Sequence, residues 1–235
     1  MSVIIDFTYK ETKEFLKGIE KDEFWLDAGG ESDCYLINGH VYKIYGLGFN
    51  LIDNTICKDD LDLESILFPN ELYMYNKRIF ACKTDTFIEE NKIKNDKLQK
   101  GEFPDLDSIK NALEQLIKDI YVLSRNHIYA DDLAWKNLLF DGNKFYIIDT
   151  LRYEHHDDRP VEQIYKENIN LLIYECFKPF IYVYYINYRS SSDKQHEIDE
   201  RVFDKLDELT PYIKETAKQI QKEFEDKEVQ KIKRP

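Results

Sequence analysis

Short apolar runs alternate with polar turns through the first 90 residues, and this pattern is typical of antiparallel strands. We expect a short helix over residues 10–20 and three strands at residues 23–28, 34–37 and 40–45. The last two strands flank Asn38-Gly39, which predicts a tight hairpin because both turn positions require a positive φ.

A second hairpin is expected between residues 71–75 and residues 79–88, with its turn at Asn76-Lys77-Arg78. Between the two hairpins, residues 48–67 have a mixed pattern that is compatible with a short helix. The first 90 residues are therefore predicted to be mostly strand.

The pattern changes after residue 90. Residues 91–105 are polar and charged and contain Gly101 and Pro104, so they are expected to form a connector. Beyond Asp107, apolar side chains recur at the three-to-four spacing of an amphipathic helix, at Ile109, Leu113, Leu116, Ile117, Ile120 and Leu123. Asp107 or Ser108 is expected to cap the first turn of this helix.

Two further helices are expected at residues 161–187 and 197–229, with no strand after residue 150. The predicted fold class is therefore α+β. We expect two lobes: a sheet-rich lobe over residues 1–90, a hinge over residues 91–105 and a helical lobe over residues 106–235.

The chain has 33 lysines and arginines against 46 aspartates and glutamates, a formal net charge of −13. This balance argues against binding of nucleic acid through broad phosphate contacts. The four cysteines are scattered, which is typical of buried thiols in a reducing compartment. The first residues do not resemble a signal peptide, and the longest apolar run, residues 180–188, is too short to span a bilayer. We therefore expect a soluble, cytoplasmic protein that binds neither membranes nor nucleic acid.

Acidic residues gather in the stretch YADDLAWKNLLFDGNKFYIIDT, residues 129–150. Asn137 follows Asp132 by five positions, and Asp149 comes twelve positions later, across a hairpin that turns at Asp141-Gly142-Asn143. Asp149 directly follows the apolar run 145–148. An acid at the end of a core strand is costly to bury without a partner, so Asp149 indicates a functional site.

Asp132-Leu133-Ala134-Trp135-Lys136-Asn137 matches the Asp-Leu-x-x-x-Asn core of the kinase catalytic loop, and Asp149 lies where kinases keep a second magnesium-binding acid. The chain thus resembles the protein-kinase-like superfamily, including its small, divergent bacterial members and the aminoglycoside phosphotransferases. The resemblance implies a two-lobed kinase fold with ATP and Mg²⁺ as cofactors. It further implies that Asp132 positions the proton of an acceptor hydroxyl, that Asn137 and Asp149 bind magnesium, and that Lys136 contacts the transferred phosphate.

The resemblance extends to the predicted sheet. The Gly29-Gly30 turn and Ser32 lie where a glycine-rich loop would cover the phosphates, and backbone N–H groups there could cradle them. Lys43, within Val41-Tyr42-Lys43-Ile44, lies where kinases carry the lysine that reaches the α and β phosphates. Asp53 is the favoured acid to pair with Lys43, and Glu64 is the next candidate.

The chain also departs from the kinase pattern: it lacks a full Gly-x-Gly-x-x-Gly, has Ala130-Asp131 in place of His-Arg and Thr150-Leu151 in place of Phe-Gly, and has no Ala-Pro-Glu. The leading hypothesis is an ATP- and magnesium-dependent protein serine/threonine kinase. Two alternatives stay open. One is a phosphotransferase for a small-molecule hydroxyl acceptor, and the other is a pseudokinase that binds nucleotide without catalysis.

Overall fold

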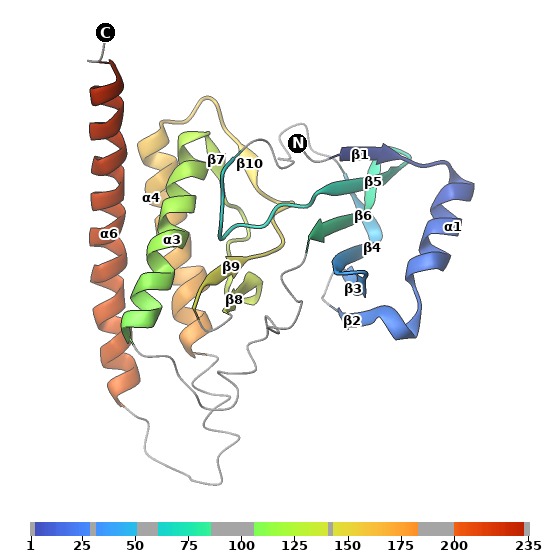
Figure 1. The fold of residues 1–235 in the computed structure, drawn as a ribbon, viewed down its shortest axis with the longest axis horizontal. Coiled ribbons are helices and arrows are strands. Elements are labelled where there is room, and N and C mark those ends of the chain that lie inside the picture. Colours follow the sequence, from blue (N-terminus) through green and yellow to red (C-terminus); the bar gives the residue numbers. More distant parts are fainter. Residues whose placement is uncertain are drawn as a thin grey trace.

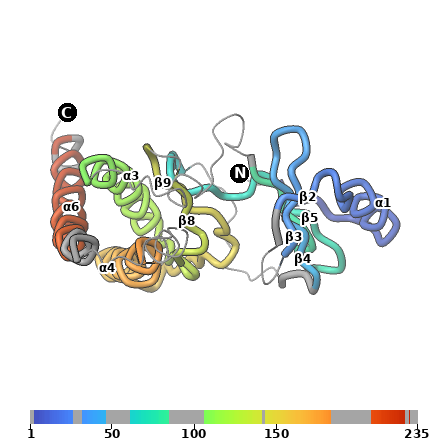
Figure 2. The backbone as a smooth tube through the Cα atoms, turned by 90° about the horizontal axis from the view of Figure 1, so that it is seen from below, coloured from blue at the N-terminus to red at the C-terminus, as the bar shows by residue number. Residues whose placement is uncertain are grey.

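The computed structural model describes residues 3–28, 32–50, 61–85, 106–140, 143–182 and 200–232. Within them, an N-terminal sheet precedes a mainly helical part, which confirms the α+β class (Figure 1). The sheet and helix α1 (Tyr9–Ile19) lie at one end of the molecule, and the other end holds α3 (Leu106–Arg125), α4 (Val161–Leu171) and α6 (Glu200–Ile232) (Figure 2). The predicted hinge, residues 91–105, lies outside the described residues, so the lobe boundaries stay predictions.

In the described part of the chain, six strands form a mixed sheet in the order β1-β5-β6-β4-β3-β2. They are β1 (Val3–Asp6), β2 (Trp25–Ala28), β3 (Ser32–Ile37), β4 (His40–Asn50), β5 (Glu71–Tyr75) and β6 (Arg78–Asp85). All neighbours are antiparallel except β1 and β5. Five strands were predicted, although the strand expected at residues 23–28 starts late, because a 3₁₀ turn covers Asp22–Phe24. β1 was missed because it is four residues long and pairs in parallel with a distant segment.

Both hairpin turns follow from local backbone chemistry. Asn38 and Gly39 have φ values of 50° and 75°, which confirms the predicted turn between β3 and β4. Asn76 and Lys77 have φ values of 51° and 63°, so the second turn contains two residues and Arg78 already belongs to β6. The predicted three-residue turn was one residue too long because Lys77 adopts a left-handed conformation that more often favours Gly or Asn.

Helix α1 begins with a capping box that its sequence encodes. The Thr8 hydroxyl accepts a hydrogen bond from the N–H of Glu11 at 3.3 Å, and the Glu11 carboxylate accepts one from the N–H of Thr8 at 2.7 Å. The helix covers one face of the sheet through an aromatic cluster, in which the rings of Phe15 and Tyr73 lie 4.5 Å apart.

The opposite face of the sheet meets the helical part. Tyr42 and Ile44 pack in the cluster on the α1 side. Because successive strand residues point to opposite faces, Lys43 projects from the other face. The apolar cluster on that face includes Tyr45 from β4 and Leu151 from the segment that follows Asp149. Lys43 therefore points toward the segment in which Asp149 lies.

Helix α3 is the centre of the helical part and packs against both α4 and α6. All six apolar positions predicted for α3 are buried. Asp107 and Ser108 lie inside the helix, which begins at Leu106, so the prediction that one of them caps it was wrong. After α4 the helix continues through a π-helical segment, η3 (Leu172–Phe177), to residue 182, where the described part of the predicted helix 161–187 ends.

Short strands position the loops between these helices. β7 (Ile128–Tyr129) pairs with β10 (Glu154–His155), and β8 (Leu138–Phe140) pairs with β9 (Phe145–Ile147). The β8–β9 hairpin was predicted. β10 contradicts the expectation of no strand after residue 150. The strand was missed because two residues are too few to show an alternating pattern.

Residues 61–70 join the sheet to the helical part. Ile147 of β9 donates its N–H to the carbonyl of Ser65 at 2.7 Å and accepts the N–H of Leu67 at 2.9 Å. Asp119 of α3 accepts the N–H groups of Glu64 and Ser65. Residues 61–67 are not helical, which contradicts a helix in that part of the mixed segment, and residues 51–60 lie outside the described residues.

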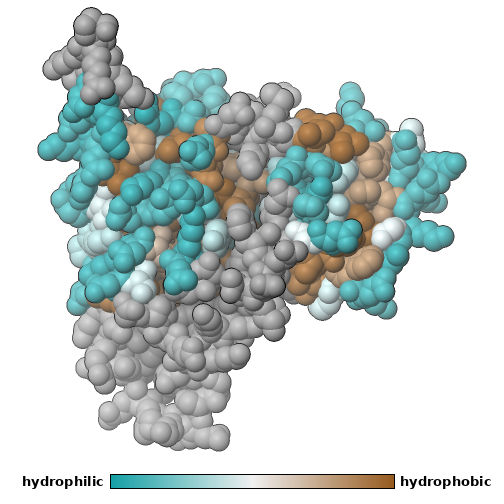
Figure 3. Space-filling model, in the orientation of Figure 1, coloured by the Kyte–Doolittle hydropathy of each residue, from teal (hydrophilic) through white to brown (hydrophobic). Residues whose placement is uncertain are grey.

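No helix in the described ranges has the length and apolar character that a membrane crossing requires. Figure 3 shows a largely hydrophilic face over α6 and α1, with hydrophobic residues gathered over β1, where Val3 and Ile4 are exposed.

Candidate functional site

Lys43 and Asp149 form an ion pair between the sheet and the helical part. The Lys43 Nζ lies 3.1 Å from the Asp149 Oδ2, and the two side chains are 14% and 34% exposed. Lys43 lies directly across from Cys34 of β3 and Cys82 of β6. Lys43 and Asp149, which are remote in sequence, are thus in contact where the two halves of the molecule meet.

The backbone turns sharply at Asp149. Its φ is 65°, in the left-handed region that Asp tolerates better than most residues. The turn is fixed on both sides, because Ile148 donates its N–H to the carbonyl of Asn137 at 2.9 Å and Thr150 donates its hydroxyl to the carbonyl of Leu67 at 3.3 Å. The strand therefore ends at Ile147, and the Asp149 side chain is directed at Lys43 rather than into the core.

Asp132 begins a second tight loop. It also has a left-handed φ, of 64°. Asn137, which is 5% exposed, donates through its Nδ2 to the Asp132 carbonyl at 3.0 Å and to the Asp132 Oδ2 at 3.3 Å. The Lys136 Nζ lies 3.4 Å from the Asp132 Oδ1, and the Lys136 side chain is 60% exposed. Because the Asn137 carbonyl also binds Ile148, the Asp132 loop and the Asp149 turn are held together.

The oxygen donors of these residues fit a hard cation. Among the described hydrogen bonds, Asn137 uses its Nδ2 and not its Oδ1, and the ion pair of Asp149 uses one of its two carboxylate oxygens. Amide and carboxylate oxygens are the ligands that Mg²⁺ accepts. The donor set therefore fits the predicted magnesium ligands.

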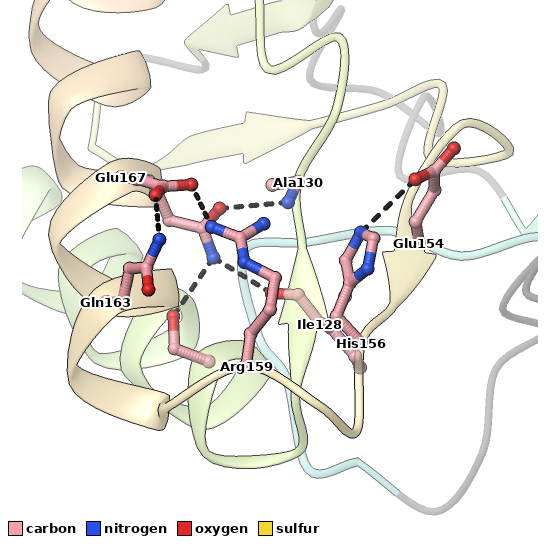
Figure 4. Close-up of polar contacts among 9 residues, drawn as sticks. Ile128, Ala130, Glu154, His156, Arg159, Gln163 and Glu167 are labelled. Carbon is pink, nitrogen blue, oxygen red and sulfur yellow. Dashed lines mark hydrogen bonds and ion pairs between the residues drawn. The ribbon is translucent and has the colours of Figure 1, made fainter.

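Asn168 of α4 holds the strand that leads to Asp132. Its side chain is fully buried, and its Oδ1 accepts the N–H of Ala130 at 2.9 Å. Its Nδ2 donates to the carbonyl of Ile128 at 2.9 Å and to the hydroxyl of Ser124 at 3.0 Å. Figure 4 shows the dashed bonds that reach Ala130 and Ile128. The kinase-like motif does not include Asn168. Its position on the apolar face of the predicted helix 161–187 could have indicated a buried amide with hydrogen-bond partners.

A polar cluster fixes the segment between Asp149 and α4. Arg159 forms an ion pair with Glu167, which also accepts a bond from Gln163 at 3.0 Å (Figure 4). The hydrogen bond from Arg159 lowers the pKa of Glu167 below its usual value. Arg159 also lies over the Tyr129 ring, 5.3 Å from its centroid. This cluster ties the segment to β7 and to the first turns of α4.

A second contact in the same segment joins the His156 Nε2 to the Glu154 Oε2 at 3.2 Å (Figure 4). The backbone N–H of His156 donates to the carbonyl of His127 at 2.8 Å. Residues 150–160 are therefore a short, braced connection to α4.

The remaining residues predicted for the nucleotide site are those of the glycine turn and the two acids expected to pair with Lys43. Gly29, Gly30 and Asp53 lie outside the described residues. Ser32 opens β3. Glu64 binds Lys144 at 2.8 Å, so the hypothesis that it pairs with Lys43 was wrong. The chain brings Lys43 to Asp149 instead, because β4 and the end of β9 meet where residues 61–70 join the two parts.

Neither a scan against protein-family models nor a search of curated proteins found a match to this chain.

Proposed function

We propose that this protein is an ATP- and magnesium-dependent phosphotransferase with a kinase-like fold. The observation that carries the proposal is the contact between Lys43 and Asp149, since one bound triphosphate with its magnesium has to reach both residues. The order of elements supports it. Counting from the strand before Gly29-Gly30, Lys43 lies on the third strand, as the phosphate-binding lysine does in protein kinases.

Each residue has a role in this proposal. Lys43 binds the α and β phosphates, exchanging one anionic partner, Asp149, for another. Asn137 and Asp149 hold Mg²⁺, which supplies positive charge against the developing charge on the phosphates. Asp132 accepts a hydrogen bond from the acceptor hydroxyl and orients its oxygen for attack. Lys136, which is exposed and lies beside Asp132, contacts the transferred phosphate.

The proposed acceptor is a hydroxyl group, in the leading hypothesis that of a protein serine or threonine. One observation favours a small-molecule acceptor instead. The connection between Asp149 and α4 is short and is braced by Arg159 and β10, whereas a protein substrate is usually docked by a longer segment there. A pseudokinase is the third possibility, because Ala130-Asp131 replaces the usual pair before the catalytic aspartate.

Thermal unfolding with and without Mg-ATP tests the proposal. At 100 times its dissociation constant, a ligand adds about 2.7 kcal/mol, which raises the Tm of a chain of this size by roughly 5–10 °C. We expect this rise in the wild type and its loss in Asp149→Asn. Asp157→Asn is the matched control, because that carboxylate is 84% exposed and lies in the nearby connection.

A transfer assay with radiolabelled ATP then separates the alternatives. Label on protein acceptors supports the protein kinase, and label on hydroxyl compounds supports the small-molecule enzyme. A magnesium-dependent rise in Tm without transfer to any acceptor, the chain itself included, supports the pseudokinase. No rise in the wild-type Tm contradicts the proposal.

A further inference from the structure

Tyr153 has a hydroxyl that the packing of the chain does not explain. The side chain is fully buried, and its Oη has no hydrogen-bond partner among the described residues. Leaving a buried donor unpaired is unfavourable, and native proteins rarely do so without a reason. Phenylalanine would fill the same space without this penalty. The hydroxyl is therefore expected to form a hydrogen bond in another state of the protein.

The backbone places Tyr153 beside both loops of the candidate site, and its ring packs edge-on against Phe68 with the ring centroids 5.7 Å apart. Glu154 of β10 pairs with Tyr129 of β7, so the antiparallel register sets Tyr153 opposite Ala130, two residues before Asp132. The N–H of Tyr153 donates to the carbonyl of Thr150 at 3.1 Å, one residue after Asp149. Tyr153 thus bridges the segments that carry the two acids.

The electrostatic environment agrees with this position. Burial raises the pKa of Tyr153 well above its usual value, and the nearby Cys176, Asp132 and Asp149 raise it further. The hydroxyl therefore keeps its proton and can act only as a hydrogen-bond donor toward a carboxylate. Cys176 belongs to the π-helical segment η3, which contacts the turn Trp135–Asn137. Such segments often occur at functional sites.

The Asp132 carboxylate has few firm contacts of its own. Its Oδ2 receives a bond of 3.3 Å from Asn137, and its Oδ1 lies 3.4 Å from the exposed Lys136. Both distances are long for hydrogen bonds to a charged group. A buried donor would hold this carboxylate from its inner side, where solvent does not compete.

We propose that Tyr153 is a positioning residue, whose hydroxyl donates a hydrogen bond to the Asp132 carboxylate when Asp132 engages the acceptor. The inference rests on the proposed phosphotransferase function. A carboxylate held in this way keeps the acceptor oxygen in line with the phosphate, and loss of such alignment lowers the rate of the chemical step more than it weakens nucleotide binding.

Tyr153→Phe tests the inference, with Tyr165→Phe as the matched control. Tyr165 is also a buried tyrosine, but its hydroxyl donates to the carbonyl of Ala217 at 3.0 Å, away from the site. We expect Tyr153→Phe to lower kcat by roughly 10- to 100-fold, with the KM for Mg-ATP unchanged and the Tm equal or higher. Tyr165→Phe should lower the Tm by about 2–4 °C and leave kcat unchanged.

The possible failures are distinct. If the wild type transfers phosphate and Tyr153→Phe keeps its kcat within about twofold, the positioning role is refuted and the proposed function stands. A Tm lowered together with kcat and a raised KM indicates a structural role and also refutes it. A wild type that transfers no phosphate overturns the proposed activity, and the inference with it.

Discussion

Asn168 provides the most direct test of how the loop before Asp132 is held. Replacing it by leucine keeps a side chain of similar size, so the change removes hydrogen bonds without opening a large cavity. The N–H of Ala130 and the carbonyl of Ile128 then lose their side-chain partner. Ser124 keeps its own bond to the carbonyl of Ile120 at 2.8 Å, so it adds little.

The size of the effect follows from these two backbone groups. Each buried group left unpaired costs about 1–3 kcal/mol, so Asn168→Leu should lower the free energy of unfolding by about 2–6 kcal/mol. For a chain of this length, that corresponds to a fall in Tm of roughly 5–20 °C. We also expect any transfer activity to fall, because the strand that leads to Asp132 is no longer fixed.

Urea denaturation monitored by circular dichroism measures this change. Asn126→Leu is the control, because the Asn126 amide donates to a backbone carbonyl at an exposed position. Its free energy of unfolding should stay within about 0.5 kcal/mol of the wild type. A loss below about 1 kcal/mol for Asn168→Leu would refute the reasoning, since it would mean that the backbone groups find other partners.

Two further predictions concern acidic residues other than Asp149. Glu64→Gln should leave the Mg-ATP-induced rise in Tm unchanged, because Glu64 binds Lys144; loss of the rise would show that Glu64 supports the nucleotide site after all. Burial raises the pKa of Asp119 above 3.8 in the folded state. Over the pH range between 3.8 and the folded-state pKa, the folded protein therefore binds more protons than the unfolded chain. The stability that Asp119 contributes falls as the pH rises through this range. Denaturation midpoints across that range should show the wild type losing stability relative to Asp119→Asn as pH rises, and a constant difference between the two proteins would contradict this assignment.

Local chemistry let several elements be predicted from the chain alone. The Asn38-Gly39 turn occurs as expected because both residues tolerate positive φ, whatever surrounds them. Helix α3 occurs as expected because its apolar side chains repeat at the spacing of one helical face. The spacing of Asp132, Asn137 and Asp149 likewise indicated a loop and a strand end, and the residues of these two segments lie together.

The partners of these residues were decided by tertiary structure. Glu64 was one acid expected to pair with Lys43, and it binds Lys144 instead. The favoured candidate, Asp53, lies outside the described residues. Lys43 contacts the distant Asp149 because the sheet and the β8–β9 hairpin are joined through residues 61–70. The bonds of Asn168 and the unpaired hydroxyl of Tyr153 depend equally on segments that meet only after folding. Turns and helices are set by interactions over a few residues, which a sequence displays directly. Contacts between distant segments depend on how those elements pack, and no local pattern records that packing.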